Sequence, residues 1–276
     1  MLQNTCIDTI ELKIRCSDTT LQHLRLMTIE NLIRNYNLII KDRKYKNYMI
    51  KKVMHNKKVL TIKSCYDGEN NEYYIHIRFA GLTNYRDEDN ISFNLLIEIT
   101  TLLKNKNIPF EIREIDIALD VYCNYKNVVM LCTKKTPKTK YYTLNEKQPF
   151  KTTRYLEKAT RNSKIRSYTY CKTTKENLNK DITRNEIKFK RQCLKDCKTS
   201  NELIEVITKN INRYKVLYFR TLEEKQYLLN KLGTETSINK RVQKKYKIYR
   251  YELTFDIEYI EMFINELYIQ NSKKVN

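Results

Sequence analysis

Regularly spaced carboxylates occur in a run that has the composition of a β-strand, residues 112–122 (IREIDIALDVY). Because side chains alternate across a strand, Glu114, Asp116 and Asp120 share one face. Three carboxylates on one face repel each other unless a cation joins them, and a divalent ion such as Mg²⁺ or Mn²⁺ is bound by oxygen ligands of this kind. These three residues are therefore candidate metal ligands. The alternative is an acidic edge strand exposed to solvent.

Tyrosines with nucleophilic chemistry follow this run. On an extended chain Tyr168 and Tyr170 point to the same face, and Tyr155 precedes them in a basic stretch. A phenol oxygen can attack a phosphodiester, form a 5′-phosphotyrosine and conserve the bond energy for religation. All three are candidate nucleophiles. The alternative for each is packing or base stacking, since the chain has 22 tyrosines.

A second strand-like run, residues 182–190 (ITRNEIKFK), carries a carboxylate among cations. Glu186 is a candidate base or metal ligand, and an ion pair with its neighbours Arg184 and Lys188 is the alternative. The cations in and beside these runs are candidate nucleic-acid contacts, namely Arg166, Lys172, Arg184, Lys188, Lys190 and Arg191.

The charge of the whole chain favours a polyanionic partner. The net charge is +21, and residues 134–198 contain 20 Lys and Arg against 6 Asp and Glu. Lys and Arg gain affinity for nucleic acid by releasing counterions from phosphates. An AT-rich genome raises Lys, Asn, Ile and Tyr together, but it explains this clustering less well than it explains abundance. DNA is therefore the predicted partner.

Several classes of site and location are disfavoured. Only three glycines occur, so the chain has no glycine-rich phosphate loop. The eight cysteines show no CxxC pair and no zinc-ligand spacing, and no signal peptide is evident, which predicts reduced thiols in a cytoplasmic protein. No apolar run approaches the length of a membrane span, and no strong amphipathic basic helix supports binding to a membrane surface, so no membrane partner is predicted.

Periodicity predicts an α+β fold with an antiparallel sheet and helices on one face. Residues 5–122 give the order strand, helix, strand, strand, helix, strand, which is compatible with a ferredoxin-like arrangement. Arg184-x-Glu186 is echoed at Arg250-x-Glu252, which suggests a second similar half. We predict an N-terminal half at 1–125 and a basic half at 126–276. The predicted strands are 5–16, 49–64, 72–80, 112–122, 164–172, 182–190 and 245–256, and the predicted helices are 19–41, 91–105, 201–214, 222–232 and 257–270.

The order of these motifs resembles that of rolling-circle plasmid and phage replication initiation factors, a group that includes some relaxases. The resemblance covers about residues 5–200. It is carried by Ile7-Asp8, Phe79-Ala80-Gly81, the run Glu114 to Asp120, the run Tyr168 to Lys172, and Arg184-Asn185-Glu186. Two positions depart from the family pattern, because Glu114 replaces an arginine and Cys171 replaces an aspartate.

The resemblance implies a Rep-nuclease-like fold and metal-dependent nicking of one strand at an origin hairpin. It implies a covalent tyrosine adduct and recruitment of a host helicase. Motif order gives Tyr170 the nucleophile position, with Tyr168 and Tyr155 still open, and gives Asp116, Asp120 and Glu186 metal or acid–base roles. A homodimer is left open. The alternative function is a non-catalytic DNA-binding protein, such as a repressor or degenerate initiator of a mobile element.

Overall fold

The computed structural model divides the described chain into two compact units. We call Ile7–Asp116, Leu194–Ser200 and Met262–Asn276 the N-terminal unit, and Met1–Cys6, Ile117–Cys193 and Asn201–Glu261 the central unit. The described residues are 3–45, 48–54, 58–69, 71–82, 90–132, 142–143, 153–155, 163–219 and 250–268.

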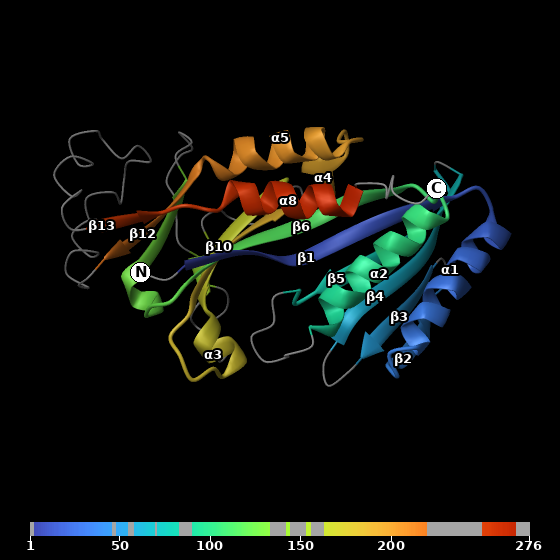
Figure 1. The fold of residues 1–276 in the computed structure, drawn as a ribbon, viewed down its shortest axis with the longest axis horizontal. Helices are drawn as coiled ribbons and strands as arrows, with labels where there is room; N and C mark the ends of the chain where they lie inside the picture. The colour runs from blue at the N-terminus through green and yellow to red at the C-terminus, as the bar shows by residue number, and fades with distance from the viewer. Residues whose placement is uncertain are drawn as a thin grey trace, which may run out of the picture. The chain divides into compact units, whose positions relative to one another are not determined.

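The N-terminal unit is an antiparallel sheet with two long helices. Its strands follow the order β2-β3-β4-β5-β1-β6, and every pair whose register is described is antiparallel. Leaving out β2 and β3, the order of elements β1-α1-β4-β5-α2-β6 is that of a ferredoxin-like fold. Figure 1 shows α1 and α2 side by side over the sheet. The elements are β1 (Gln3–Cys16), α1 (Thr19–Arg34), β2 (Ile39–Lys44), β3 (Tyr48–Met54), β4 (Lys58–Asp67), β5 (Glu72–Ala80), α2 (Ile91–Asn105) and β6 (Phe110–Val121).

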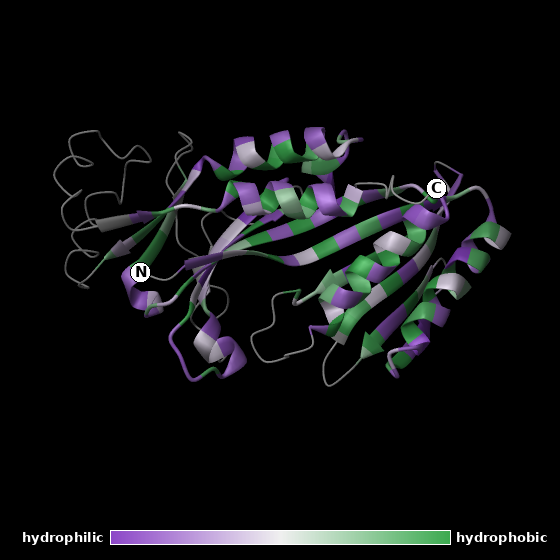
Figure 2. Ribbon diagram, in the orientation of Figure 1, coloured by the Kyte–Doolittle hydropathy of each residue, from purple (hydrophilic) through white to green (hydrophobic). Residues whose placement is uncertain are grey.

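Alternation along β1 and β5 explains this layering. Ile10, Leu12 and Ile14 are fully buried, whereas the residues between them are polar. The bands of hydrophobic and hydrophilic residues along the strands in Figure 2 follow this period of two. Burying one apolar face under amphipathic helices is what an antiparallel sheet of this pattern requires. The α1 helix begins as its sequence predicts, because the Asp18 side chain accepts a hydrogen bond of 2.7 Å from the Leu21 amide.

The central unit contains two groups of strands. In the first, β11 and β10 are followed by the short β9 and β8, and in the second the order is β13-β12-β7. The elements are η1 (Tyr125–Asn127), β7 (Val128–Cys132), β8 (Tyr142–Thr143), β9 (Arg154–Tyr155), β10 (Ile165–Cys171), α3 (Lys172–Glu176), β11 (Thr183–Phe189), α4 (Arg191–Leu194), α5 (Ser200–Ile211), β12 (Tyr214–Phe219) and β13 (Arg250–Leu253). The last helix, α8 (Ile257–Tyr268), begins in the central unit and continues from Met262 in the N-terminal unit.

The predicted α+β class with an antiparallel sheet is confirmed, and several elements were predicted with nearly correct ends. The helix predicted over 19–41 is wrong in its last part, because it ends at Arg34 and β2 begins at Ile39. The single strand predicted over 49–64 is two strands, β3 and β4. The predicted helix 222–232 lies outside the described residues. The division at residue 125 and the second similar half stay predictions.

Candidate active site

The tyrosines and the Arg-x-Glu motif meet on one face of paired strands. In the antiparallel register of β10 and β11, Tyr168 lies directly opposite Glu186, and Tyr170 lies opposite Arg184. Directly opposed residues project to the same side of a sheet. Alternation in the sequence assigned the tyrosines to one face of their strand and Glu186 to one face of its own strand. The register of β10 and β11 shows that both faces are on the same side of the sheet.

Two tyrosine hydroxyls share the carboxylate of Glu186. The Tyr168 hydroxyl donates to Oε1 of Glu186, and the Tyr170 hydroxyl donates to Oε2 at 3.4 Å. The two rings are stacked, with centroids 6.0 Å apart and planes inclined by 22°. Glu186 and Tyr170 are each 3% exposed, whereas Tyr168 is only partly buried. Tyr168 is therefore the more accessible of the two phenols that contact this carboxylate.

Further residues flank the tyrosine pair. The Lys175 ammonium lies over the Tyr170 ring, 4.3 Å from its centroid, which restricts access to that ring. The backbone of Tyr155 on β9 is directly opposite Tyr168 in the antiparallel register. The third predicted tyrosine thus belongs to the neighbouring strand at the same level of the sheet.

Asp120 lies in a buried ion-pair network. Arg184 donates from Nε to Oδ1 at 2.7 Å and from Nη2 to Oδ2 at 2.6 Å, and the Lys172 ammonium lies 3.8 Å from Oδ2. Asp120, Arg184 and Lys172 are at most 1% exposed. Lys172 also lies 3.7 Å from Glu176, so two cations and two carboxylates balance each other. Such bidentate geometry is the arrangement that makes a buried ion pair tolerable.

The predicted metal ligands do not form one ligand set. Asp120 belongs to the network with Arg184, whereas Glu114 is paired with Arg78 and Asp116 lies 3.9 Å from the same guanidinium. Within the described part of the chain, no group of three His, Cys, Asp or Glu side chains is arranged to hold an ion. Each carboxylate already faces a cation, which removes the repulsion that pointed to a metal. Glu114, Asp116 and Asp120 are thus not gathered around one position, and their role as Mg²⁺ or Mn²⁺ ligands stays a prediction.

The predicted nucleic-acid contacts fall into two groups. Lys172 and Arg184 point into the protein, where they balance Asp120. Lys188 and Arg166 are directly opposed in the register of β10 and β11, and both are partly exposed. The pKa of Lys190 is lowered, first by desolvation and then by the positive charges of Arg166 and Lys188. Arg191 is exposed at the start of α4. The positive charges of Arg166, Lys188 and Lys190 thus lie close enough together to act on one another.

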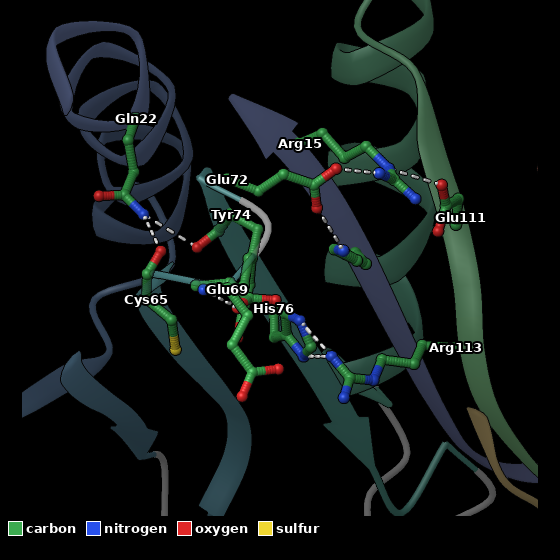
Figure 3. Close-up of polar contacts among 11 residues, drawn as sticks. Arg15, Gln22, Cys65, Glu69, Glu72, Tyr74, His76, Glu111 and Arg113 are labelled. Carbon is green, nitrogen blue, oxygen red and sulfur yellow. Dashed lines mark hydrogen bonds and ion pairs between the residues drawn. The ribbon is translucent and has the colours of Figure 1, made fainter. Parts of the chain in front are cut away.

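Figure 3 shows a polar cluster in the N-terminal unit that the sequence did not indicate. His76 Nδ1 lies 2.8 Å from Glu11 Oε1, and Arg113 Nη1 lies 2.5 Å from His76 Nε2. A guanidinium only donates, so these partners assign Nε2 as the acceptor and Nδ1–H as the donor to Glu11. The neutral imidazole thus contacts both Glu11 and Arg113, whose Nη1 also lies 3.0 Å from Nδ1. His76 was visible as a sheet histidine, but only strand register gives it these partners.

This cluster predicts a loss of stability in acid. The pKa of His76 is lowered by burial and by Arg113, although Glu11 opposes the shift. Burial acts to raise the pKa of Glu11, but the hydrogen bond from His76 and the charges of Arg113 and Arg78 leave it lowered. Below the unfolded pKa of histidine, about 6.5, the unfolded chain takes up a proton that folded His76 does not. The free energy of unfolding is then expected to fall as the pH drops.

Urea unfolding at several pH values between about pH 7 and pH 5 measures the slope of the free energy of unfolding against pH. His76→Gln keeps a donor and an acceptor but does not titrate, so its slope in that range is expected to be smaller. Glu11→Gln is expected to reduce the further loss below about pH 4.3, where only the unfolded carboxylate is protonated. Equal slopes for His76→Gln and the unaltered protein would contradict the assignment.

None of the described helices combines the length and apolar composition needed to cross a bilayer.

No family model matches the chain, and no curated protein matches it. Among solved structures, the chain is similar to a rolling circle replication initiator protein from Geobacillus stearothermophilus, with 15% sequence identity and a TM-score of 0.44. The alignment covers 96% of this chain and 97% of that one. At this level the likeness does not decide the family.

Proposed function

We propose that the protein cleaves one strand of DNA with Tyr168 as the nucleophile and Glu186 as the general base. The observation that carries the proposal is the hydrogen bond from the Tyr168 hydroxyl to the buried Glu186 carboxylate. A phenol acts as a nucleophile near neutral pH when a base is positioned within hydrogen-bond distance of its hydroxyl. The order of sequence motifs adds the biological role, initiation of rolling-circle replication.

The proposed step transfers one phosphodiester bond. The Tyr168 oxygen forms a bond to phosphorus, and the bond between phosphorus and the 3′ oxygen of the preceding nucleotide breaks. The phenolic proton goes to Glu186, and the departing 3′ oxygen takes a proton from solvent. The products are a 5′-phosphotyrosine and a free 3′ hydroxyl, which can prime synthesis or attack the adduct in religation.

Charge near the tyrosine supports a phosphate substrate. Arg166 and Lys188 are directly opposed on β10 and β11, two residues along each strand from Tyr168 and Glu186. They therefore lie on the same face of the sheet as Tyr168. Cations at this position can neutralise the phosphate and stabilise the charge that develops on its oxygens. Tyr170 differs in role, because it is buried and holds the second oxygen of Glu186. We therefore assign it to positioning the base, although motif order gave it the nucleophile position.

A divalent ion would polarise the phosphate, as the family resemblance implies. The described carboxylates do not form its ligand set, so the requirement for Mg²⁺ or Mn²⁺ stays a prediction. Recruitment of a host helicase and formation of a homodimer also stay predictions of the resemblance.

Mapping the covalent adduct tests the nucleophile. The protein is incubated with a random pool of single-stranded oligonucleotides and Mg²⁺ or Mn²⁺, and DNA that stays bound after detergent denaturation is recovered. Trypsin cleaves after Arg166 and Lys172, so Tyr168 and Tyr170 fall in one peptide, SYTYCK. Fragmentation by mass spectrometry is expected to locate the nucleotide on Tyr168.

Variants complete this test. Tyr168→Phe is expected to abolish the adduct, and Tyr170→Phe is expected to retain it at a reduced rate. An adduct on Tyr170 or Tyr155 would replace Tyr168 as the nucleophile and keep the activity. Salt-sensitive DNA binding without any adduct would overturn the catalytic proposal and favour a non-catalytic DNA-binding protein.

A further inference from the structure

A second basic and aromatic surface lies in the N-terminal unit, on strands that carry none of the proposed catalytic residues. Lys41 of β2, Lys52 of β3 and Thr61 of β4 form one row of directly opposed residues. Lys51, the neighbour of Lys52, pairs with Glu30 of α1 at 3.0 Å and so marks the helix side of the sheet. By alternation, the row with Lys52 is on the side away from α1.

The next row on the same side adds more cations and two aromatic rings. Arg43, Ile50 and Lys63 are directly opposed across β2, β3 and β4. Next to this row, the rings of Tyr45 and Tyr48 stack with centroids 4.5 Å apart and planes inclined by 23°. We call Lys41, Arg43, Tyr45, Tyr48, Lys52 and Lys63 the sheet platform.

The tyrosines of the platform are oriented for contact with a flat ligand. The Lys63 ammonium lies over the Tyr48 ring, 4.4 Å from its centroid, and Tyr45 is 41% exposed. An exposed ring that is already held by a stacked neighbour loses little freedom when a third ring stacks on it. A nucleic-acid base is such a ring, and every base has a stacking face.

The charges of the platform are not balanced, in contrast to the rest of this sheet face. On β1, Lys13 lies 3.3 Å from Glu72, and Arg15 lies 2.9 Å from Glu111. Such pairs neutralise the part of the face that Figure 3 shows. The centre of the sheet therefore offers little attraction for a polyanion.

On the outer strands, Lys41, Arg43 and Lys52 have no carboxylate partner among the residues that the structure describes. All three are exposed. Lys41 and Lys52 are directly opposed across β2 and β3, and like charges in that position are unfavourable. An anion bound along this row would remove the repulsion, which makes the platform complementary in charge to a phosphate backbone.

We propose that the sheet platform binds single-stranded DNA, with phosphates along Lys41, Arg43 and Lys52 and a base stacked on Tyr45. The exposed Tyr45 ring beside a row of cations that have no carboxylate partner among the described residues suits unpaired bases, because bases in a duplex are stacked on each other and cannot reach a ring. The proposal does not depend on strand cleavage, since the proposed nucleophile and base belong to the central unit.

Equilibrium binding of the full chain to fluorescent oligo-dT, followed by anisotropy, tests the proposal. Tyr45→Ala is expected to weaken binding about fivefold or more through lost stacking. The triple variant Lys41→Gln, Arg43→Gln, Lys52→Gln is expected to reduce the slope of log K against log salt by about 2, as three lost contacts to a single strand require.

The matched control removes the same charge elsewhere. Lys106, Lys195 and Lys209 are exposed and lie outside β2, β3 and β4, and their triple change to Gln gives an identical net charge. This control is expected to bind oligo-dT almost as the unaltered protein does. Equal weakening by both triple variants would overturn the platform and leave only an effect of net charge. Thermal unfolding of each variant checks that the fold is retained.

Two further measurements separate the alternatives. Duplex DNA of the same length is expected to lose little affinity in the Tyr45→Ala variant, and an equal loss would overturn the assignment to single strands. If Tyr168→Phe abolishes the adduct while platform variants bind normally, only the platform proposal fails. If platform variants bind poorly and no adduct forms in any variant, only the cleavage proposal fails.

Discussion

Replacing Glu186 with Gln is expected to lower the rate of covalent adduct formation by about 10² to 10⁴-fold, the range found for loss of a general base. The Gln side chain has the same shape and can still accept a hydrogen bond from Tyr168. It cannot take the phenolic proton as the oxygen attacks phosphorus. Single-turnover measurements with a saturating single-stranded oligonucleotide report this step without contributions from binding or product release.

The binding affinity of the Glu186→Gln variant is expected to stay unchanged, because the carboxylate lies under Tyr168 and is 3% exposed. Glu252 provides a matched control. It occupies the same place in the second Arg-x-Glu run, on β13, and pairs with Lys215 at 2.7 Å on the surface. Glu252→Gln is expected to leave the adduct rate unaltered. A similar loss in both variants would show that charge, rather than proton transfer, limits the reaction.

The parts of the fold that the sequence predicted well are those in which local pattern and burial agree. On β5, Ile75, Ile77 and Phe79 alternate with polar residues, and the strand was predicted at its observed ends, Glu72–Ala80. The helix α2 was also predicted at its observed ends, Ile91–Asn105. In both elements the apolar spacing that identifies the structure is the same spacing that fills the core.

The elements that were missed have no such pattern. β2 has the sequence IIKDRK, and most of its side chains are exposed. Nothing local distinguishes it from the last turn of a helix, so the prediction continued the helix to residue 41. Its strand conformation follows from pairing with β3, where the Lys51 ammonium donates a hydrogen bond of 2.9 Å to the Asp42 carboxylate across the two strands. Edge strands of this kind are fixed by contacts that a local pattern does not contain.

The candidate site was predictable in composition but not in connection. Alternation placed Tyr168 and Tyr170 on one face, which the structure agrees with. The register that sets Glu186 against Tyr168 is a property of two paired strands, and no pattern within either strand determines it. For a related reason, the ion pair of Asp120 was not predicted. The partner of Asp120 is Arg184, which lies 64 residues away in the sequence.

The largest effects on stability are expected at this buried pair. Asp120→Asn is expected to lower the free energy of unfolding by about 3–5 kcal/mol, because it leaves Arg184 and Lys172 buried without their shared carboxylate. Thermal and urea unfolding measure the loss, and the midpoint of thermal unfolding is expected to fall by roughly 10 °C. Removing the exposed pair through Glu252→Gln is expected to cost less than about 1 kcal/mol, which controls for the loss of any ion pair.

The network also predicts an asymmetry between its partners. Arg184→Met removes the guanidinium, but the Lys172 ammonium remains 3.8 Å from Asp120 and keeps the carboxylate partly compensated. Asp120→Asn leaves two buried cations with only Glu176 beside Lys172. Asp120→Asn is therefore expected to destabilise the protein more than Arg184→Met does. The double variant is expected to lose less free energy of unfolding than the two single variants lose in sum, because removing either residue alone leaves the charge of the other without its partner. Strict additivity, or a larger loss for Arg184→Met, would contradict the shared role of Asp120.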